Sequence, residues 1–116
     1  DESGKGQEKV YDVVWSDAGQ RQPGPDGKVP PVGNTVDVAT ATWRDTIGEP
    51  GLQAVWTDPD FDPQQPAFYY ARVIEIPTPR WTAYDQVRFG VKMPDEVPMT
   101  HQERAWTSPI WYSPSD

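Results

Sequence analysis

The sequence predicts an all-β fold, a small β-sandwich with long proline-rich loops and one short helix. Three observations support this prediction. Fourteen prolines interrupt the 116 residues, so the regular elements are expected to be short. Several segments alternate β-branched or aromatic residues with small or polar ones, which is the period of a strand. Six Trp, five Tyr and three Phe supply large core side chains, although hydrophobic residues make up only 35% of the chain.

The predicted strands are short, and turn-forming residues separate them. In the first strand Tyr11, Val13 and Trp15 share one face at a period of two. The second has apolar or small residues on both faces, which suggests that each face is at least partly covered. The fourth is the strongest, because almost none of its positions is polar. The strands are expected at residues 9–15, 35–44, 52–57, 67–76 and 105–112.

The one predicted helix, at residues 83–89, lies inside a long excursion that spans residues 77–104. Thr82 and Asp85 resemble a capping box in which Asp replaces Glu. Gly90 stands where the end of a helix favours glycine. We therefore expect a single turn-rich loop with a brief helix at its centre.

The length of the chain suits one domain. Residues 1–8 are polar and are expected to be disordered or a linker, and residues 9–114 are expected to form a single module. The absence of cysteine excludes disulfides, thiolate zinc sites and cysteine nucleophiles. Because the chain begins at Asp1 with no initiator Met, we expect it to be part of a longer protein.

The net charge of −8 bears on the partners of the chain. A phosphate backbone would be repelled by this charge, so nucleic acid is not an expected partner. No apolar run is long enough to span a bilayer, and we expect a soluble chain.

Three carboxylates at alternate positions form a weak calcium candidate: Asp58, Asp60 and Asp62. They match the first three ligand positions of a calcium loop, but Pro63 stands where that loop needs glycine and Tyr69 where it needs a bidentate Glu. We favour the simpler interpretation of an acidic turn, since Asp and Pro are turn formers. A calcium site stays open as the alternative.

Catalytic chemistry is sparse in this sequence. His101 is the one histidine, and no paired nucleophile accompanies it. No signature of a nucleotide, flavin or pyridoxal cofactor is present. We therefore expect no catalytic residue and no cofactor.

The tryptophans invite two interpretations. Most lie in predicted strands, where one face is core, and large aromatic side chains dominate both cores and interfaces. Alternatively, exposed rings stack on sugars. Trp81, beside Arg80, is the one tryptophan predicted in a loop. The ligand or interface candidates are Arg80, Trp81, Trp106 and Trp111.

A limited resemblance refines the sandwich. Residues 69–73, Tyr-Tyr-Ala-Arg-Val, resemble the penultimate strand of fibronectin type III domains, and residues 106–110 resemble their last strand. This resemblance implies an immunoglobulin- or fibronectin-III-like sandwich. Tyr69 would then be a tyrosine-corner residue, with its ring inward and its hydroxyl bonded to upstream backbone.

A longer resemblance points to a family. Residues 67–81 resemble the C-terminal region of the bacterial domain-of-unknown-function family DUF3604, as do residues 32–38, 56–63 and 102–112. The N-terminal part of that family is similar to PHP-type metal-dependent phosphoesterases, and its His- and Asp-rich metal motif does not occur in these 116 positions. No catalytic residue is therefore carried over.

What this resemblance implies is a non-catalytic accessory or structural β domain at the C-terminus of a metal-dependent hydrolase. Its partner would be the remainder of its own polypeptide, and its location periplasmic or extracellular. The alternative is an independent carbohydrate- or ligand-binding module that uses exposed tryptophans.

Overall fold

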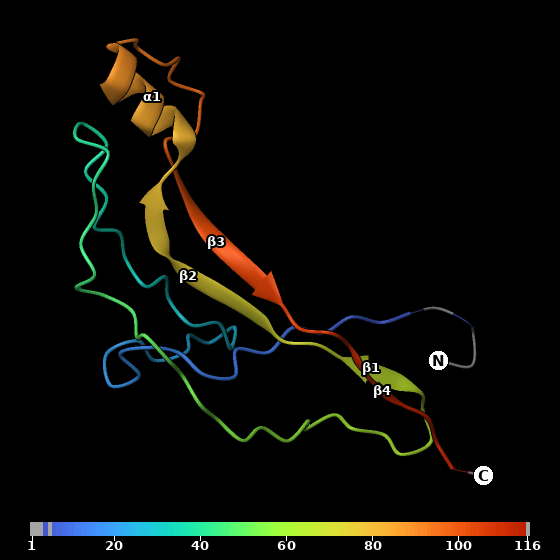
Figure 1. Ribbon diagram of the computed structural model, residues 1–116. Helices are drawn as coiled ribbons and strands as arrows, with labels where there is room; N and C mark the ends of the chain where they lie inside the picture. The colour runs from blue at the N-terminus through green and yellow to red at the C-terminus, as the bar shows by residue number, and fades with distance from the viewer. Residues whose placement is uncertain (1–3, 5, 116) are drawn as a thin grey trace.

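The computed structural model describes residue 4 and residues 6–115. It is mostly β with one short helix, as the sequence predicts, and its regular elements all lie in the second half of the chain (Figure 1). The prediction of a disordered or linking segment at residues 1–8 falls partly on residues 1–3 and 5, outside the described residues. The elements are β1 (Ala67–Tyr69), β2 (Arg72–Pro79), α1 (Trp81–Phe89), β3 (Thr100–Trp106) and β4 (Ile110–Tyr112).

The strands form two small antiparallel sheets, one made of β1 and β4 and the other of β2 and β3. They follow one another along a single narrow ribbon, with α1 at its tip (Figure 1). At the break between the sheets the Thr107 amide donates to the Ala71 carbonyl (3.0 Å), and the Ala71 amide donates to the Thr107 hydroxyl (2.9 Å). These bonds keep the two sheets in line.

The ends of the ribbon strands differ from the prediction. The expected strand at residues 67–76 is present, but it is interrupted after Tyr69 and continues to Pro79. The expected strand at 105–112 is divided in the same way. β3 begins at Thr100, so residues 77–104 are not one loop: they hold the end of β2, the helix, a turn and most of β3. Pairing with β2 overrides the low strand propensity of the polar segment in β3.

The helix is confirmed, although it begins two residues earlier than expected. Gly90 ends it with a left-handed φ of 63°. The predicted capping box is wrong, because Arg80 occupies the cap position and no side chain caps the helix. The Thr82 hydroxyl instead donates to the Pro98 carbonyl (2.7 Å), which ties the helix to the turn before β3. Ala83 is fully buried on the same side.

Three predicted strands are wrong: residues 9–15, 35–44 and 52–57 form no strand. A strand needs a partner for its backbone groups, and none of the described residues pairs with the first or the third. The second folds back on itself, since the Asp37 side chain accepts from the Ala39 amide (3.0 Å) and Asp37 bridges Thr42. Local turn formation therefore replaces an extended strand.

The described chain has almost no interior. Its radius of gyration is 19.3 Å, against about 13 Å for a compact domain of this length. Its accessible surface is 9560 Å², about 3,200 Å² more than a folded monomer of 13.1 kDa exposes. The two sheets lie end to end (Figure 1). The described residues therefore confirm the predicted β character. They do not show two sheets packed face to face, as an immunoglobulin-like sandwich requires.

None of the helices among the described residues has the length and apolarity needed to cross a membrane.

Candidate functional site

Aromatic side chains gather on both faces of the β1–β4 sheet. On one face Phe68 lies opposite Trp111, with ring centroids 5.0 Å apart. Tyr70 extends this group, because its ring lies 6.3 Å from that of Phe68 and is inclined by only 14° to it. About half of the Phe68 and Tyr70 side chains and 71% of Trp111 are exposed. This face is an open aromatic surface.

The opposite face of β1–β4 is more enclosed. Tyr69 and Tyr112 project from it and are half-buried. The Tyr112 ring packs edge-on against Phe61 at 4.9 Å, and its hydroxyl donates to the Pro63 carbonyl (2.9 Å). Trp56 lies 6.4 Å from the Tyr69 ring. This face therefore holds the coil of residues 56–63 against the ribbon.

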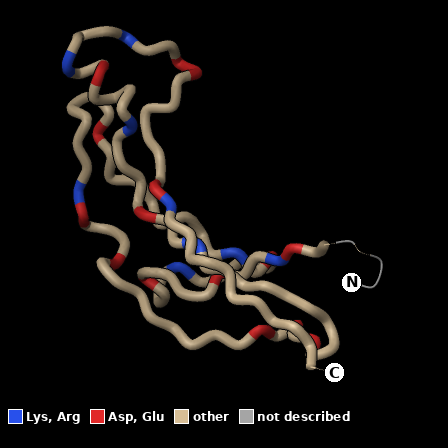
Figure 2. Tube along the Cα trace, turned by 45° about the vertical axis from the view of Figure 1, so that its right-hand side comes forward, with Lys and Arg blue, Asp and Glu red and all other residues tan. Residues whose placement is uncertain are grey.

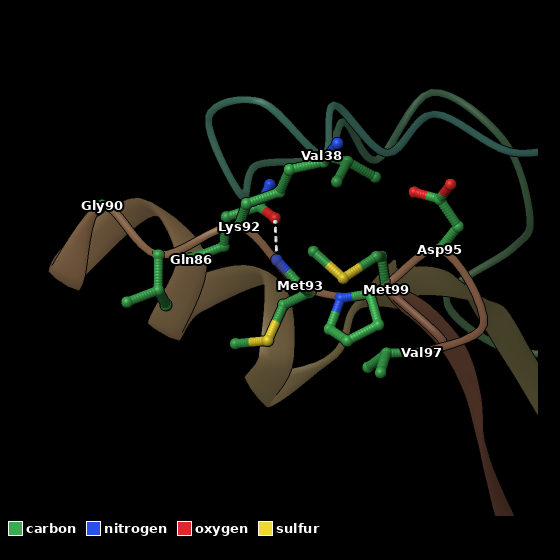
Figure 3. A pocket seen from close by; sticks show the side chains of 10 residues that line it. Val38, Gln86, Gly90, Lys92, Met93, Asp95, Val97 and Met99 are labelled. Carbon is green, nitrogen blue, oxygen red and sulfur yellow. Dashed lines mark hydrogen bonds between the residues drawn. The ribbon is translucent and has the colours of Figure 1, made fainter.

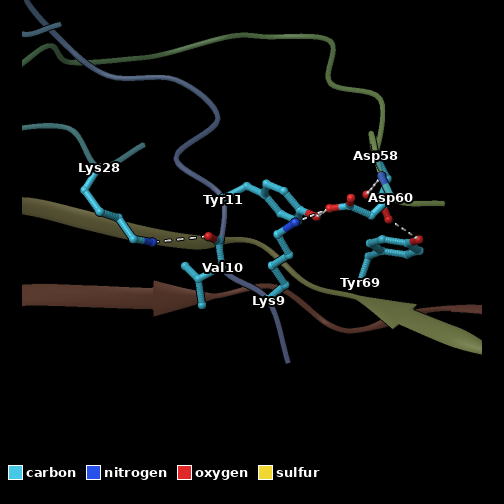
Figure 4. A network of polar contacts seen from close by, with 7 residues as sticks. All are labelled: Lys9, Val10, Tyr11, Lys28, Asp58, Asp60 and Tyr69. Atoms are coloured by element: carbon cyan, nitrogen blue, oxygen red, sulfur yellow. Dashed lines mark hydrogen bonds and ion pairs between the residues drawn. The ribbon is translucent and has the colours of Figure 1, made fainter. Parts of the chain in front are cut away.

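A polar cluster joins the N-terminal segment to the same coil (Figure 4). The Lys9 ammonium and the Tyr11 hydroxyl both donate to one carboxylate oxygen of Asp60. The Tyr69 hydroxyl donates to the Asp58 carboxylate (2.8 Å). The tyrosine-corner prediction assigned this hydroxyl to upstream backbone, whereas the acceptor here is an upstream side chain.

The electrostatics of the cluster favour a tether over proton transfer. Hydrogen bonding to Asp60 raises the pKa of Lys9 and that of Tyr11, and hydrogen bonding from Lys9 lowers the pKa of Asp60. Hydrogen bonding to Asp58 raises the pKa of Tyr69. Each shift moves the pKa away from neutrality, whereas a general acid or base works best with a pKa near the operating pH.

The calcium candidates do not converge on one point. Asp58 accepts from Tyr69 and from the Asp60 amide (2.9 Å), Asp60 accepts from Lys9, and Asp62 accepts from the Gln64 amide (2.9 Å). Among the described residues no group of three or more His, Cys, Asp or Glu side chains is arranged to hold a metal ion. The local bonds are those of an acidic turn.

The predicted ligand or interface residues are spread along the ribbon. Arg80 and Trp81 lie at the start of α1, whereas Trp111 lies in β4 at the other end (Figure 1). Trp106 ends β3 and is 59% exposed. Of these candidates only Trp111 joins an aromatic group. Sequence reasoning missed Phe68 and Tyr70 as its neighbours, although their i, i+2 spacing in a strand was a usable signal.

Most tryptophans are exposed, contrary to the expectation that one face of each strand is core. Trp15 is the exception and is half-buried. A strand forms a core face only where another layer covers it, and these residues have no such layer. The exposed tryptophans are Trp43, Trp56, Trp81, Trp106 and Trp111.

Two hollows on the described surface are large enough to consider as sites. One, of about 590 Å³, lies between the turn near Val38 and the segment after α1, with Met93, Val97 and Met99 around it (Figure 3). The Met93 amide donates to the Gln86 side chain (3.1 Å) at its wall. The other, of about 550 Å³, lies between the N-terminal segment and the turn near Lys28. Both are open to solvent, and neither contains paired groups for nucleophilic chemistry.

Comparisons with known proteins place the chain in a family without adding an activity. A search of curated proteins found no match. A search of solved structures also found none. The sequence model of a family described as a protein of unknown function, DUF3604, matches residues 1–114. The chain therefore belongs to the DUF3604 family.

Proposed function

We propose that this chain is a non-catalytic accessory part of a longer DUF3604 polypeptide, and that the rest of that polypeptide covers its aromatic surface. The observation that carries the proposal is the excess of about 3,200 Å² of accessible surface over that of a compact monomer. Permanent interfaces bury about 2,000–5,000 Å² in total, and they are more apolar than transient ones. Half of that area lies on each partner, so the excess on this chain alone is larger than one side of such a contact, about 1,000–2,500 Å².

The side chains that would be covered are of the right kind. Phe68, Trp106 and Trp111 are each more than half exposed, and both Val73 and Ile74 of β2 are exposed although they point to opposite faces of the ribbon. A monomer rarely exposes apolar side chains on both faces of a sheet, because neither face is then removed from water. Covering both faces requires polypeptide on both sides of the ribbon.

The further parts of the proposal concern the whole protein. The chain would lie in its C-terminal region, and a PHP-like, metal-dependent hydrolase part would supply the catalysis in a periplasmic or extracellular protein. An immunoglobulin-like sandwich would form once strands from the rest of the polypeptide pack on the ribbon.

The test compares the 116-residue chain with the natural full-length protein by hydroxyl-radical footprinting of tryptophan. We expect Trp106 and Trp111 to be labelled in the chain alone and shielded in the full-length protein. Trp15, half-buried already, serves as the internal reference. Equal labelling of Trp106 and Trp111 in both proteins would contradict the proposal.

One observation favours a second candidate, a carbohydrate- or ligand-binding module. Phe68 and Tyr70 present nearly parallel, half-exposed rings beside Trp111, and such a platform suits stacking on the face of a sugar ring. Affinity electrophoresis over a range of polysaccharides tests it. Binding that is lost in Trp111→Ala and kept in Trp81→Ala would favour this function. Absence of polysaccharide binding by the wild-type chain would contradict this second function.

A further inference from the structure

Four residues of β3 have backbone N–H and C=O groups that point away from β2. The Arg80 amide donates to the Met99 carbonyl (2.9 Å) at one end of the ladder, and the Thr107 amide donates to the Ala71 carbonyl (3.0 Å) at the other. Hydrogen-bonded and non-hydrogen-bonded pairs alternate along an antiparallel ladder. Counting inward from both ends gives the same set of β3 residues with outward N–H and C=O groups: Thr100, Gln102, Arg104 and Trp106.

The outer edge of β2 is interrupted by contrast. Pro77 and Pro79 occupy its outward positions near the helix, and neither has an N–H to donate. The coil also lies against this strand, since a Cβ added at Gly48 would stand 2.6 Å from the Ile76 Cγ2 atom. Figure 1 shows that coil on the β2 side of the ribbon. The β2 edge keeps outward N–H groups only at Arg72 and Ile74, so β3 offers the longer uninterrupted edge to a further strand.

One face of the ribbon is positive in a chain whose net charge is −8. Arg72 lies opposite Trp106 and Ile74 lies opposite Arg104, so these four side chains share a face. All four are exposed, and neither arginine forms an ion pair with another described residue. Figure 2 shows Lys and Arg residues near the middle of the molecule, with Asp and Glu residues among them.

We propose that the outer edge of β3 pairs with an extended strand from the rest of the polypeptide, and that this strand places carboxylates on the face that carries Arg72 and Arg104. The inference rests on the proposed function and adds the place and the chemistry of the contact. Four outward amides match a strand of ordinary length. In such strand addition the main-chain hydrogen bonds supply affinity, and the alternate side chains supply specificity.

The rest of the polypeptide suits this edge better than a second copy of the chain. Two copies joined edge to edge through β3 would leave the β1–β4 aromatic surface and both faces of β2 uncovered. The excess surface extends over all of these parts. Two chains of net charge −8 also repel each other, whereas a strand with carboxylates is attracted to the face that carries Arg72 and Arg104.

The first experiment needs no variant. Residue-resolved hydrogen exchange is measured on the 116-residue chain and on the natural full-length protein. We expect the outward amides of Gln102 and Arg104 to exchange at least about a hundredfold more slowly in the full-length protein, because a protected amide exchanges only on local opening. The inward amide of Ala105 serves as the reference for a bond that exists in both proteins.

The second experiment uses a matched pair of variants. Arg104→Pro and Arg72→Pro each remove one arginine from the same face and one outward N–H, but from opposite edges of the ribbon. Each variant is made in the natural full-length protein, and the exchange rate of the outward Gln102 amide is measured. We expect Arg104→Pro to raise this rate by about tenfold more than Arg72→Pro, the effect of one lost hydrogen bond to the added strand. Arg104→Glu should raise it, whereas Arg104→Lys should leave it unchanged.

Each outcome is decisive. If the outward β3 amides exchange freely in the full-length protein while Trp106 and Trp111 are shielded, this inference is overturned and the proposed function stands. If those tryptophans also stay labelled, both are overturned. Equal effects of the two proline variants contradict pairing at the β3 edge. Protection that is already present in the 116-residue chain, together with a dimer in sedimentation, assigns the edge to a second copy instead.

Discussion

Residues 67–112 and residues 6–66 are held by different kinds of contact. The first region has two hydrogen-bonded ladders and a helix. The second has one isolated bridge, between Asp37 and Thr42, and is otherwise held by turns and side chains. For example, the Lys28 ammonium donates to the Val10 carbonyl (3.2 Å). The difference shows that strands form here only where two segments pair, and that the unpaired segments are held by local turns and side-chain contacts.

The reason lies in which segments meet. β2 and β3 face each other across a short helix and turn, so closing the ribbon costs little chain entropy. The predicted strands in the first region have comparable β propensity, but their backbone groups have no partner among the described residues. A strand is a property of a pair, whereas a turn is a property of its own few residues.

The largest expected difference between the two regions is in hydrogen exchange of the isolated chain. Amides of residues 9–15 and 52–57 should exchange at nearly the rate of an unfolded peptide, because no ladder protects them. The inward amides of Val73 and Ala105 should be slower. Residue-resolved exchange by NMR provides the measurement. Equal protection of the amides in both regions would contradict this difference.

The contact between the regions is tested at Gly48. A side chain there meets Ile76, and the φ of 79° is unfavourable for any residue with a Cβ. We expect Gly48→Val to lower the free energy of unfolding of the full-length protein by about 1–3 kcal/mol, measured by urea denaturation. Gly27→Val is the matched control, since Gly27 has a similar φ of 73° and nothing lies within 4 Å of its added Cβ. A similar loss in both variants would contradict the contact.

Within the ribbon, Thr82 tests how the helix is attached. Thr82 is buried, and its hydroxyl donates to the Pro98 carbonyl. Thr82→Val should destabilise the full-length protein by about 0.5–1.5 kcal/mol, because a partly buried hydrogen bond is lost. Thr82→Ser keeps the hydroxyl and should restore most of the loss in the same denaturation experiment. No rescue by serine would show that packing, not the hydrogen bond, holds the helix.

The smallest expected effect is that of pH on the exposed tether of the N-terminal segment. The pKa of Asp60 is lowered, so its contribution is present above the ordinary Asp value of about 4 and is lost as the pH falls through the lowered value. The pKa values of Lys9 and Tyr11 are raised, so their contributions are present below about 10 and are lost as the pH rises through the raised values.

The tether should therefore persist from about pH 4 to about pH 10 and weaken outside that range. NMR chemical shifts of the Tyr11 ring report its release. Asp60→Asn should abolish the pH dependence at the acid end, and 1 M salt should reduce the effect, because exposed ion pairs are screened. Asp62→Asn is the control, since Asp62 contacts neither Lys9 nor Tyr11. A pH profile unchanged by Asp60→Asn would exclude this carboxylate as the anchor.

Much of the ribbon could be predicted because its signals are local. Residues 67–76 have almost no polar position, and Gly90 marks the end of the helix. β3 could not be predicted from its own sequence, Thr-His-Gln-Glu-Arg-Ala-Trp, which is largely polar. Its strand conformation comes from pairing with β2. Tertiary context also decides the role of Thr82. Its sequence suggests a helix cap, but its hydroxyl donates to the carbonyl of Pro98 instead.

The candidate site divides in the same way. Trp106 and Trp111 were identified from residue type alone, because large aromatic side chains concentrate at interfaces. Strand register decides the rest. It places Trp111 beside Phe68 and far from Trp81, and it brings Arg72 and Arg104 to one face. Register brings together residues that are distant in sequence, and the spacing within one segment does not encode it.

By itself the sequence determined the β character, the position of one helix, the acidic charge and the membership of DUF3604. These follow from composition and from patterns a few residues long. Only the tertiary structure decided that the strands form one ribbon, that the aromatic side chains stay exposed and that prolines interrupt the outward N–H groups of β2 but not those of β3. The physical reason is that burial and hydrogen-bond pairing belong to segments that meet in space, whereas propensity belongs to the segment alone.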